Sequence, residues 1–189
     1  MPQPRILVFA GSIRTGALSA KLAALAAKEL SLLDAEVSLI SLADYPMPVY
    51  DGDLEAREGP PETARKLRAR LAAHRGVFIA TPEYNASIPP LLKNTIDWVS
   101  RVRDPVDPFK EGVFAIGATS NGRLGGYRGL IALRQVLELG LGALVLPEQV
   151  AIQEASQAFD EAGSLRDERS AKLLRAALTR LIVMAEADL

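Results

Sequence analysis

The chain has 189 residues, 49% of them apolar and 24% charged, a composition typical of a folded globular domain and not of a disordered segment. Its formal net charge of -1 excludes recruitment of nucleic acid by bulk electrostatics. It has no cysteine, which excludes disulfides, thiolate nucleophiles and cysteine-ligated metal centres. We expect a single domain, residues 1–189, with one sizeable core.

No segment has the pattern of a signal peptide or a membrane span. The apolar run Ile6–Phe9 is too short for a signal core, and no later run approaches ~18 uninterrupted apolar residues. We therefore expect a soluble cytoplasmic protein with no membrane partner.

Apolar strands alternate with amphipathic helices in the first half of the chain. A strand is expected at Arg5–Ala10, and leucines from Leu18 to Leu33 then recur at helical spacing. A second strand is expected at Glu36–Leu42. The acidic, proline-rich stretch from Asp44 to Pro61 is expected to be a surface loop, and Thr63–His74 a basic amphipathic helix.

The same alternation continues to the C-terminus. We expect strands at Gly76–Thr81, Gly112–Thr119 and Leu141–Ile152, the last interrupted near Pro147, and helices at Pro89–Val102, from Tyr127 to Leu139, and through Leu174 to Ala185 with Ser164 as its cap. Five strands interleaved with helices predict a parallel, doubly wound sheet covered on both faces. Ligands of such sheets bind beyond the carboxyl ends of the strands, so the loops after the first, third and fourth strands are the candidate site.

The first of these loops has the features of an anion site. Gly11 to Ser19 is small and rich in hydroxyl groups, carries Arg14, and opens directly into a helix. Free N–H groups and the positive end of the helix dipole favour an anion there, and Ser12, Thr15 and Ser19 can donate to it. The loop lacks the glycine patterns of dinucleotide and P-loop sites, which favours a monophosphate. A strand–helix turn in which Ser12 or Thr15 only caps the helix is the alternative.

The loop after the third strand combines an aromatic ring with polar side chains. Ser87 and the prolines that follow are explained as a helix start. Pro82, Glu83, Tyr84 and Asn85 are not, and a planar heteroaromatic ligand favours such surroundings. An exposed turn without a ligand remains the alternative.

The loop after the fourth strand, Thr119–Gly126, has three glycines in eight residues. Glycines permit unusual dihedral angles and a close approach of the backbone to a ligand. Taken alone, this loop is better explained as a flexible turn.

Taken together, the segments Gly11–Arg14, Thr81–Pro89 and Leu92–Arg101 resemble the NAD(P)H-dependent FMN reductase family, which includes quinone, azo-dye and chromate reductases. The resemblance extends over nearly the whole chain, including Gly125-Gly126. It implies an α/β, flavodoxin-like three-layer sandwich with a five-stranded parallel sheet in the order 2-1-3-4-5. It also implies FMN and NADPH (or NADH) as cofactors, and a homodimer or homotetramer.

The resemblance also implies a role for each matching residue. The phosphate of FMN is expected on the first loop, and the isoalloxazine ring on the other two. The expected cofactor-binding residues are Ser12, Arg14, Thr15, Gly16, Ser19, Pro82, Glu83, Tyr84, Asn85 and Ser120. The family often has serine where Ala17 stands and asparagine where Ser19 stands, so one hydroxyl group is missing from the phosphate loop.

FMN itself supplies the redox chemistry in such an enzyme, so we name no catalytic residue and no metal ligand. The expected scheme is ping-pong: NAD(P)H reduces the flavin and leaves, and a quinone or similar acceptor then takes two electrons from the same face. Arg14 or Arg123 could read the additional phosphate of NADPH. A flavodoxin-type electron carrier and a non-catalytic flavin-binding module are the rival functions; the first is usually strongly acidic, which a net charge of -1 opposes.

Several conspicuous residues are interpreted as structural. His74 is the only histidine and is expected at the surface, remote from the three loops. The basic residues of the helix Thr63–His74 are expected to form a solvated face: Arg65, Lys66, Arg68 and Arg70. Trp98 is interpreted as packing and not as a flavin contact; the family places its helix at a dimer interface.

Overall fold

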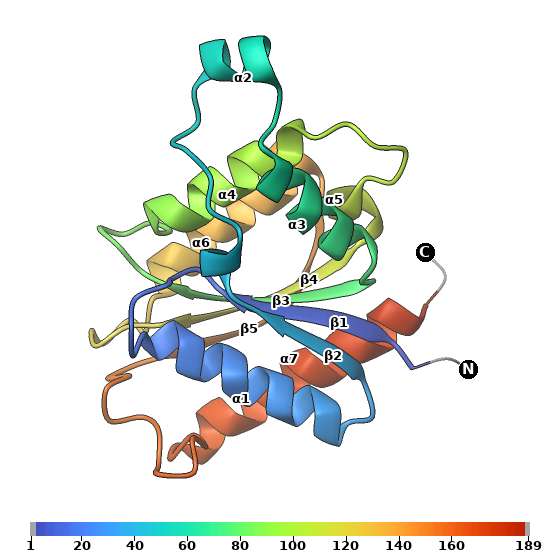
Figure 1. Ribbon diagram of the computed structural model, residues 1–189. Coiled ribbons are helices and arrows are strands. Elements are labelled where there is room, and N and C mark those ends of the chain that lie inside the picture. Colours follow the sequence, from blue (N-terminus) through green and yellow to red (C-terminus); the bar gives the residue numbers. More distant parts are fainter. Residues whose placement is uncertain (1–2, 188–189) are drawn as a thin grey trace.

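The computed structural model describes residues 3–187 and contains one parallel sheet (Figure 1). Its strands are β1 (Arg5–Ala10), β2 (Glu36–Ile40), β3 (Gly76–Pro82), β4 (Val113–Thr119) and β5 (Leu144–Ile152). They lie in the order β2-β1-β3-β4-β5, and every neighbouring pair is parallel. This confirms the flavodoxin-like order 2-1-3-4-5. The three central strands are almost wholly buried, as their continuous apolar sequences predict.

Helices cover both faces of the sheet, which gives three layers (Figure 1). One face is covered by α1 (Leu18–Leu32) and α7 (Glu168–Glu186); the other by α3 (Glu62–Ala72), α4 (Pro90–Arg101), α5 (Pro108–Glu111) and α6 (Tyr127–Arg134). Successive strand residues point to opposite faces, so each face has its own core. Ile6 and Val8 pack in the cluster that includes α1 and α7, whereas Leu7 and Phe9 pack in the one that includes α3, α4 and α6.

The segment expected as a loop at 44–61 contains regular structure that the sequence analysis missed. A 3-10 turn, η1 (Leu42–Asp44), precedes it, and a short helix, α2 (Gly52–Glu58), stands away from the sheet at the top of Figure 1. The carboxylate of Asp51 accepts the N–H of Asp53 at 2.8 Å and caps this helix. We refer to residues 46–61 as the arm.

The root of the arm is fixed to α4 by side chains that bond to its backbone. Trp98 is fully buried, and its indole N–H donates to the carbonyl of Pro48 at 2.8 Å. Asn94 donates to the same carbonyl and accepts the N–H of Tyr50, both at 2.8 Å. Burial of Trp98 in this core confirms that its role is packing.

The interruption expected near Pro147 is a bulge in β5. Phe114 of β4 pairs with Val145, and Ile116 of β4 pairs with Gln149. The step is two residues along β4 but four along β5, so β5 bulges between these pairs. The guanidinium of Arg134 donates to the carbonyl of Leu146 at 2.7 Å and so holds the bulge. The helix expected from Tyr127 to Leu139 is α6 followed by a wider turn, η2 (Gln135–Gly140).

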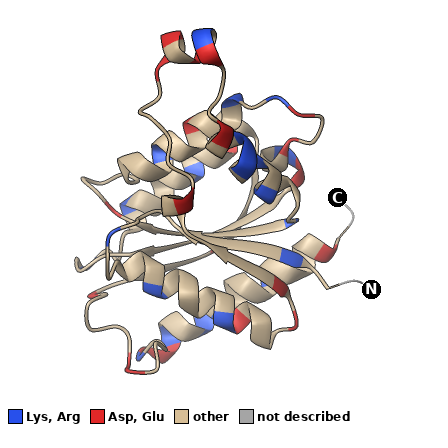
Figure 2. Ribbon diagram, viewed as in Figure 1, with Lys and Arg blue, Asp and Glu red and all other residues tan. Residues whose placement is uncertain are grey.

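Three local expectations are wrong. His74 is 3% exposed, because it follows the end of α3 and its ring bonds to Ser38 of β2. Arg68 is also buried and donates to the carbonyl of Val106 at 3.0 Å. The other basic residues of this face are exposed, and Figure 2 marks them in blue on α3: Arg65, Lys66 and Arg70. The cap of α7 is Asp167, which accepts the N–H of Ser170, and not Ser164.

Candidate functional site

The three loops expected to carry the site leave the same edge of the sheet. They follow β1, β3 and β4, which are adjacent strands, so their carboxyl ends meet. The N–H of Gly11 donates to the carbonyl of Ala80 at 2.8 Å and joins the first loop to β3. A Cβ atom at Gly11 would lie 3.0 Å from Leu92, so this close approach of the first loop to α4 favours glycine.

The first loop presents backbone donors that have no acceptor among the residues that the structure describes. Within residues 3–187, the N–H groups of Ser12, Ile13, Thr15 and Gly16 bond to nothing, and the loop leads into the N-terminus of α1. Such groups, together with the helix dipole, make an anion site. These unpartnered donors fit a phosphate monoester better than a turn in which a hydroxyl group caps the helix, because α1 has no side-chain cap.

Side chains of the first loop add donors and positive charge. Ser12 accepts the N–H of Arg14 at 3.3 Å, so its own hydroxyl proton is free to donate. Arg14 is exposed, and the only bond of its guanidinium in the described part of the chain is to the carbonyl of Thr15 at 3.4 Å. Ser19 is 1% exposed, and its hydroxyl group has no partner among the described residues. An unpartnered buried hydroxyl beside the free N–H groups also fits an anion ligand.

The loop after β3 is a tight hairpin that holds Tyr84 at the edge of the sheet. Tyr84 and Ser87 exchange two backbone hydrogen bonds, at 2.9 and 3.0 Å. The two residues between them, Asn85 and Ala86, have φ values of 50° and 63°. This is the geometry of a type I′ turn, which fixes the loop rigidly. Tyr84 is 44% exposed, so its ring is available to a ligand.

The side chain of Glu83 points from this hairpin to α6. Its carboxylate accepts the N–H groups of Arg128 and Gly129 at 3.1 and 3.3 Å and forms an ion pair with the guanidinium of Arg128. The side chain is 5% exposed. Glu83 was predicted for the site from the sequence but Arg128 was not, because no motif joins residues 45 positions apart.

The loop after β4 packs closely on β5 and the segment that follows it. The N–H of Ser120 donates to the carbonyl of Ile152 at 3.1 Å, and its hydroxyl group accepts the N–H of Gly122, also at 3.1 Å. Gly125 and Gly126 have φ values of +61° and +88°, and a Cβ atom on either would lie 2.8 Å from a neighbouring carbon. The glycines therefore serve close backbone packing.

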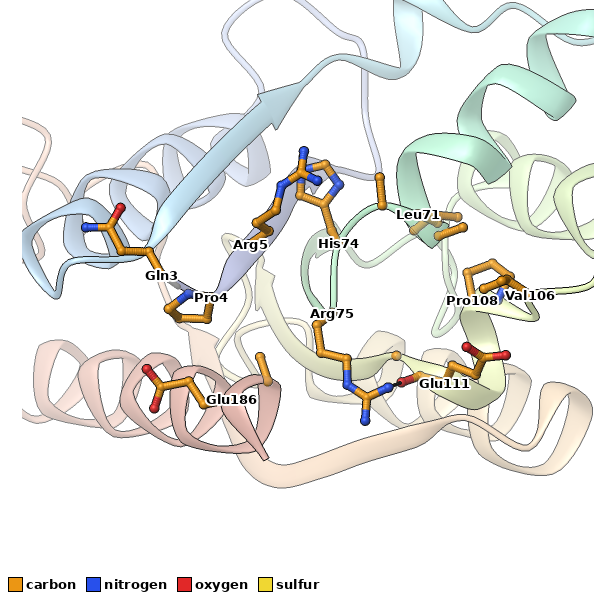
Figure 3. A pocket seen from close by; sticks show the side chains of 14 residues that line it. Gln3, Pro4, Arg5, Leu71, His74, Arg75, Val106, Pro108, Glu111 and Glu186 are labelled. Carbon is orange, nitrogen blue, oxygen red and sulfur yellow. Dashed lines mark hydrogen bonds between the residues drawn. The ribbon is translucent and has the colours of Figure 1, made fainter. Parts of the chain in front are cut away.

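A separate cavity of about 490 Å³ opens at the other ends of the strands (Figure 3). Arg5, His74, Arg75 and Glu111 are among the residues that line it. Arg5 begins β1 and Arg75 precedes β3, so this cavity lies at the amino ends and away from the three loops. It contributes nothing to the candidate site.

Comparison with known proteins gives a consistent result. The family model for NADPH-dependent FMN reductase matches residues 4–157. A quinone reductase of Escherichia coli strain K12 is 36% identical over 142 residues, 75% of this chain and 73% of the relative. An NAD(P)H-dependent FMN reductase of Pseudomonas aeruginosa is 37% identical over 179 residues, 94% of this chain and 92% of the relative.

Solved structures agree with the fold. FerB of Paracoccus denitrificans, described as a flavoenzyme NAD(P)H:(acceptor) oxidoreductase, has a TM-score of 0.78 and 30% sequence identity, and the match covers 97% of both chains. An oxidoreductase of Corynebacterium diphtheriae, at 18% identity and a TM-score of 0.70, shares the fold.

Among the described residues, no helix has the length and apolar character needed to span a bilayer.

Proposed function

Because this chain belongs to the NADPH-dependent FMN reductase family, we propose that it holds FMN on the loops after β1, β3 and β4 and passes two electrons from NAD(P)H to quinones or similar acceptors. Its relatives are reductases with an NAD(P)H substrate, so the chain is an NAD(P)H-dependent FMN oxidoreductase and not a flavodoxin-type carrier. The ping-pong order and the roles of single residues are parts of the proposal.

One observation carries the placement of the cofactor: the unpartnered N–H groups of the loop after β1. In the proposal, Ser12, Thr15 and Gly16 donate to the phosphate, and Arg14 adds a compensating charge. The buried, unpartnered hydroxyl group of Ser19 is a further reason to place the phosphate of the cofactor at this loop.

The other two loops are proposed to hold the ring. The type I′ turn keeps Pro82, Tyr84 and Asn85 fixed at the end of β3, and Ser120 lies at the end of β4. When bound, FMN supplies hydride acceptance and the return of two electrons to an acceptor. The chain would orient the ring and offer N–H donors for the negative charge of its reduced form, and reductant and acceptor would bind at the same place in turn.

We include a homo-oligomer and a cytoplasmic location in the proposal. Tyr127 and Ile131 are about half exposed on α6, and aromatic and apolar side chains of this kind are enriched at subunit interfaces. Light scattering on a gel-filtration peak distinguishes a monomer from a dimer or tetramer. A monomer at micromolar concentration would contradict this part of the proposal.

The first test is the absorbance spectrum of the purified protein with FMN, before and after anaerobic NADPH. We expect a yellow complex that NADPH bleaches within seconds and that a quinone restores. Bound flavin that NADPH does not bleach would contradict the reductase function, and no bound flavin would contradict the site. Arg14→Ala is the matched variant: it should weaken FMN binding but leave riboflavin binding unchanged, because riboflavin lacks the phosphate.

A further inference from the structure

Glu83 makes contacts that a residue bordering the flavin ring does not need. Its carboxylate accepts two backbone N–H groups in the first turn of α6, from Arg128 and Gly129, and the Nε of Arg128 donates to it at 2.7 Å. The carboxylate therefore caps α6 from another loop, 45 residues earlier in the chain. A carboxylate at a helix N-terminus is stabilised by the helix dipole and by the free N–H groups there.

The backbone of the hairpin also rests on α6. A Cβ atom at Gly129 would lie 3.4 Å from the Cβ of Glu83 and 3.4 Å from the carbonyl oxygen of Ser87. Both ends of the hairpin thus contact the same residue of the helix. Since α6 begins directly after Gly126, the hairpin and the loop after β4 are joined through one helix end.

The negative charge of Glu83 is compensated by the guanidinium of Arg128. The side chain is 5% exposed, whereas Arg128, its partner, is 56% exposed. A buried carboxylate without such a partner would place an uncompensated negative charge near the proposed ring site, and this would disfavour a reduced flavin. The ion pair and the helix cap therefore fix the position of the hairpin and also compensate the negative charge near the proposed ring site.

We propose that Glu83 is a positioning residue that sets the flavin-ring hairpin against α6 and thereby aligns it with the loop after β4. The proposal rests on the function proposed above, since it concerns the same site. It assigns Glu83 to the alignment of the loops through its side chain and leaves only its backbone for the ring. Arg128 is the partner whose guanidinium pairs with the buried Glu83 carboxylate.

Flavin affinity tests the proposal, because riboflavin and FMN report different ends of the site. The dissociation constants of both flavins are measured by fluorescence quenching for the wild type, Glu83→Ala and Arg14→Ala. Glu83→Ala should weaken both flavins by the same factor, about tenfold or more, because it releases the ring hairpin. Arg14→Ala should weaken FMN alone. Unchanged riboflavin binding in Glu83→Ala, or a loss confined to FMN, would overturn the proposal.

The midpoint potential of the bound flavin is a second readout, which a purely structural cap would not move. Glu83→Gln keeps an oxygen for the N–H of Gly129 but removes the negative charge, so the potential should rise and the affinity should remain near that of the wild type. Arg128→Ala leaves the Glu83 charge uncompensated, so the potential should fall. Glu62→Gln, which breaks an exposed ion pair with Lys66, is the matched control and should not change it.

If Glu83→Ala does not fold, the proposal is still tested by two other variants. Glu83→Gln and Arg128→Ala keep the helix cap, and their potentials should move in opposite directions. Equal potentials in both variants and the wild type would then overturn the proposal. A wild-type protein that binds FMN but is not bleached by NADPH would instead contradict the reductase function and leave these affinity differences measurable.

Discussion

The Nε2 atom of His74 lies 2.8 Å from the hydroxyl oxygen of Ser38, which joins the end of α3 to the edge strand β2. The Nδ1 atom lies 2.6 Å from the carbonyl oxygen of Arg70, so the N–H is on Nδ1 and Ser38 donates to Nε2. In this neutral form both ring nitrogens are paired. Protonation would require Nε2 to donate to the same hydroxyl group in a buried site.

We expect the protein to lose stability as the pH falls below 6.5. Burial lowers the pKa of His74 from its ordinary value of 6.5; the hydrogen bond to the Arg70 carbonyl and the charge of Glu36 oppose this, and the charges of Arg5 and Arg70 assist it. The unfolded chain then binds a proton at a higher pH than the folded chain. Stability from this group is full above pH 6.5 and declines toward the lowered folded pKa. Urea unfolding at pH 8, 6.5 and 5.5 measures this slope.

His74→Gln is the variant that isolates the effect. Glutamine does not titrate. The free energy of unfolding of the variant should therefore fall less between pH 6.5 and 5.5 than that of the wild type, whatever its stability at pH 8. An identical pH dependence in the two proteins would show that carboxylates, and not His74, cause the decline.

Serine at position 17 should stabilise the protein. Ala17 is the N-cap of α1 and provides no side-chain acceptor. A serine hydroxyl there can accept an N–H of the first turn, worth about 1 kcal/mol, which corresponds to roughly 2–4 °C in the melting temperature of a domain of this size. The measurement is a thermal melt without flavin. Ala176→Ser, at an exposed position inside α7, should be neutral or slightly destabilising, because serine is a poorer helix former than alanine.

The fold could be predicted because its signals are local. Continuous apolar runs identified β1, β3 and β4, and their order places three loops at one edge without any knowledge of side-chain contacts. The free N–H groups of the first loop could also be predicted, since they depend on residues next to one another in the chain; that they bind an anion stays a prediction.

The errors at His74 and Glu83 share one cause: the deciding partner is distant in sequence. His74 ends a basic helix, which predicts exposure, but Ser38 on β2 buries it. The contacts of Glu83 depend on Arg128, in a helix that no motif connects to it. The helix α2 was missed because seven residues between proline-rich segments give too short a pattern for helical periodicity.

Glycine at position 86 should stabilise the hairpin. Ala86 has a φ of 63°, in the left-handed region that costs a residue with a Cβ about 1–2 kcal/mol, and it is exposed, so few contacts are lost. Glycine costs about 0.5–1 kcal/mol in chain entropy, which leaves a net gain of roughly 0.5–1 kcal/mol. Chemical denaturation measures it. The matched control is Ala69→Gly in the exposed part of α3, which should destabilise by about the same amount; equal effects of the two variants would contradict the strain argument.

Asn94→Ala should release the arm without affecting the flavin site. The side chain makes two backbone hydrogen bonds to the arm, to Pro48 and Tyr50, and each contributes about 0.5–1.5 kcal/mol. The bond from Trp98 to Pro48 remains. Amide exchange at Tyr50 should therefore accelerate roughly tenfold or more, while exchange in β3 and the affinity for FMN stay as in the wild type. Lys93→Ala, which removes only a surface ion pair with Asp97, should not change exchange in the arm. A loss of FMN affinity in Asn94→Ala would show instead that the arm and the three loops are coupled through α4.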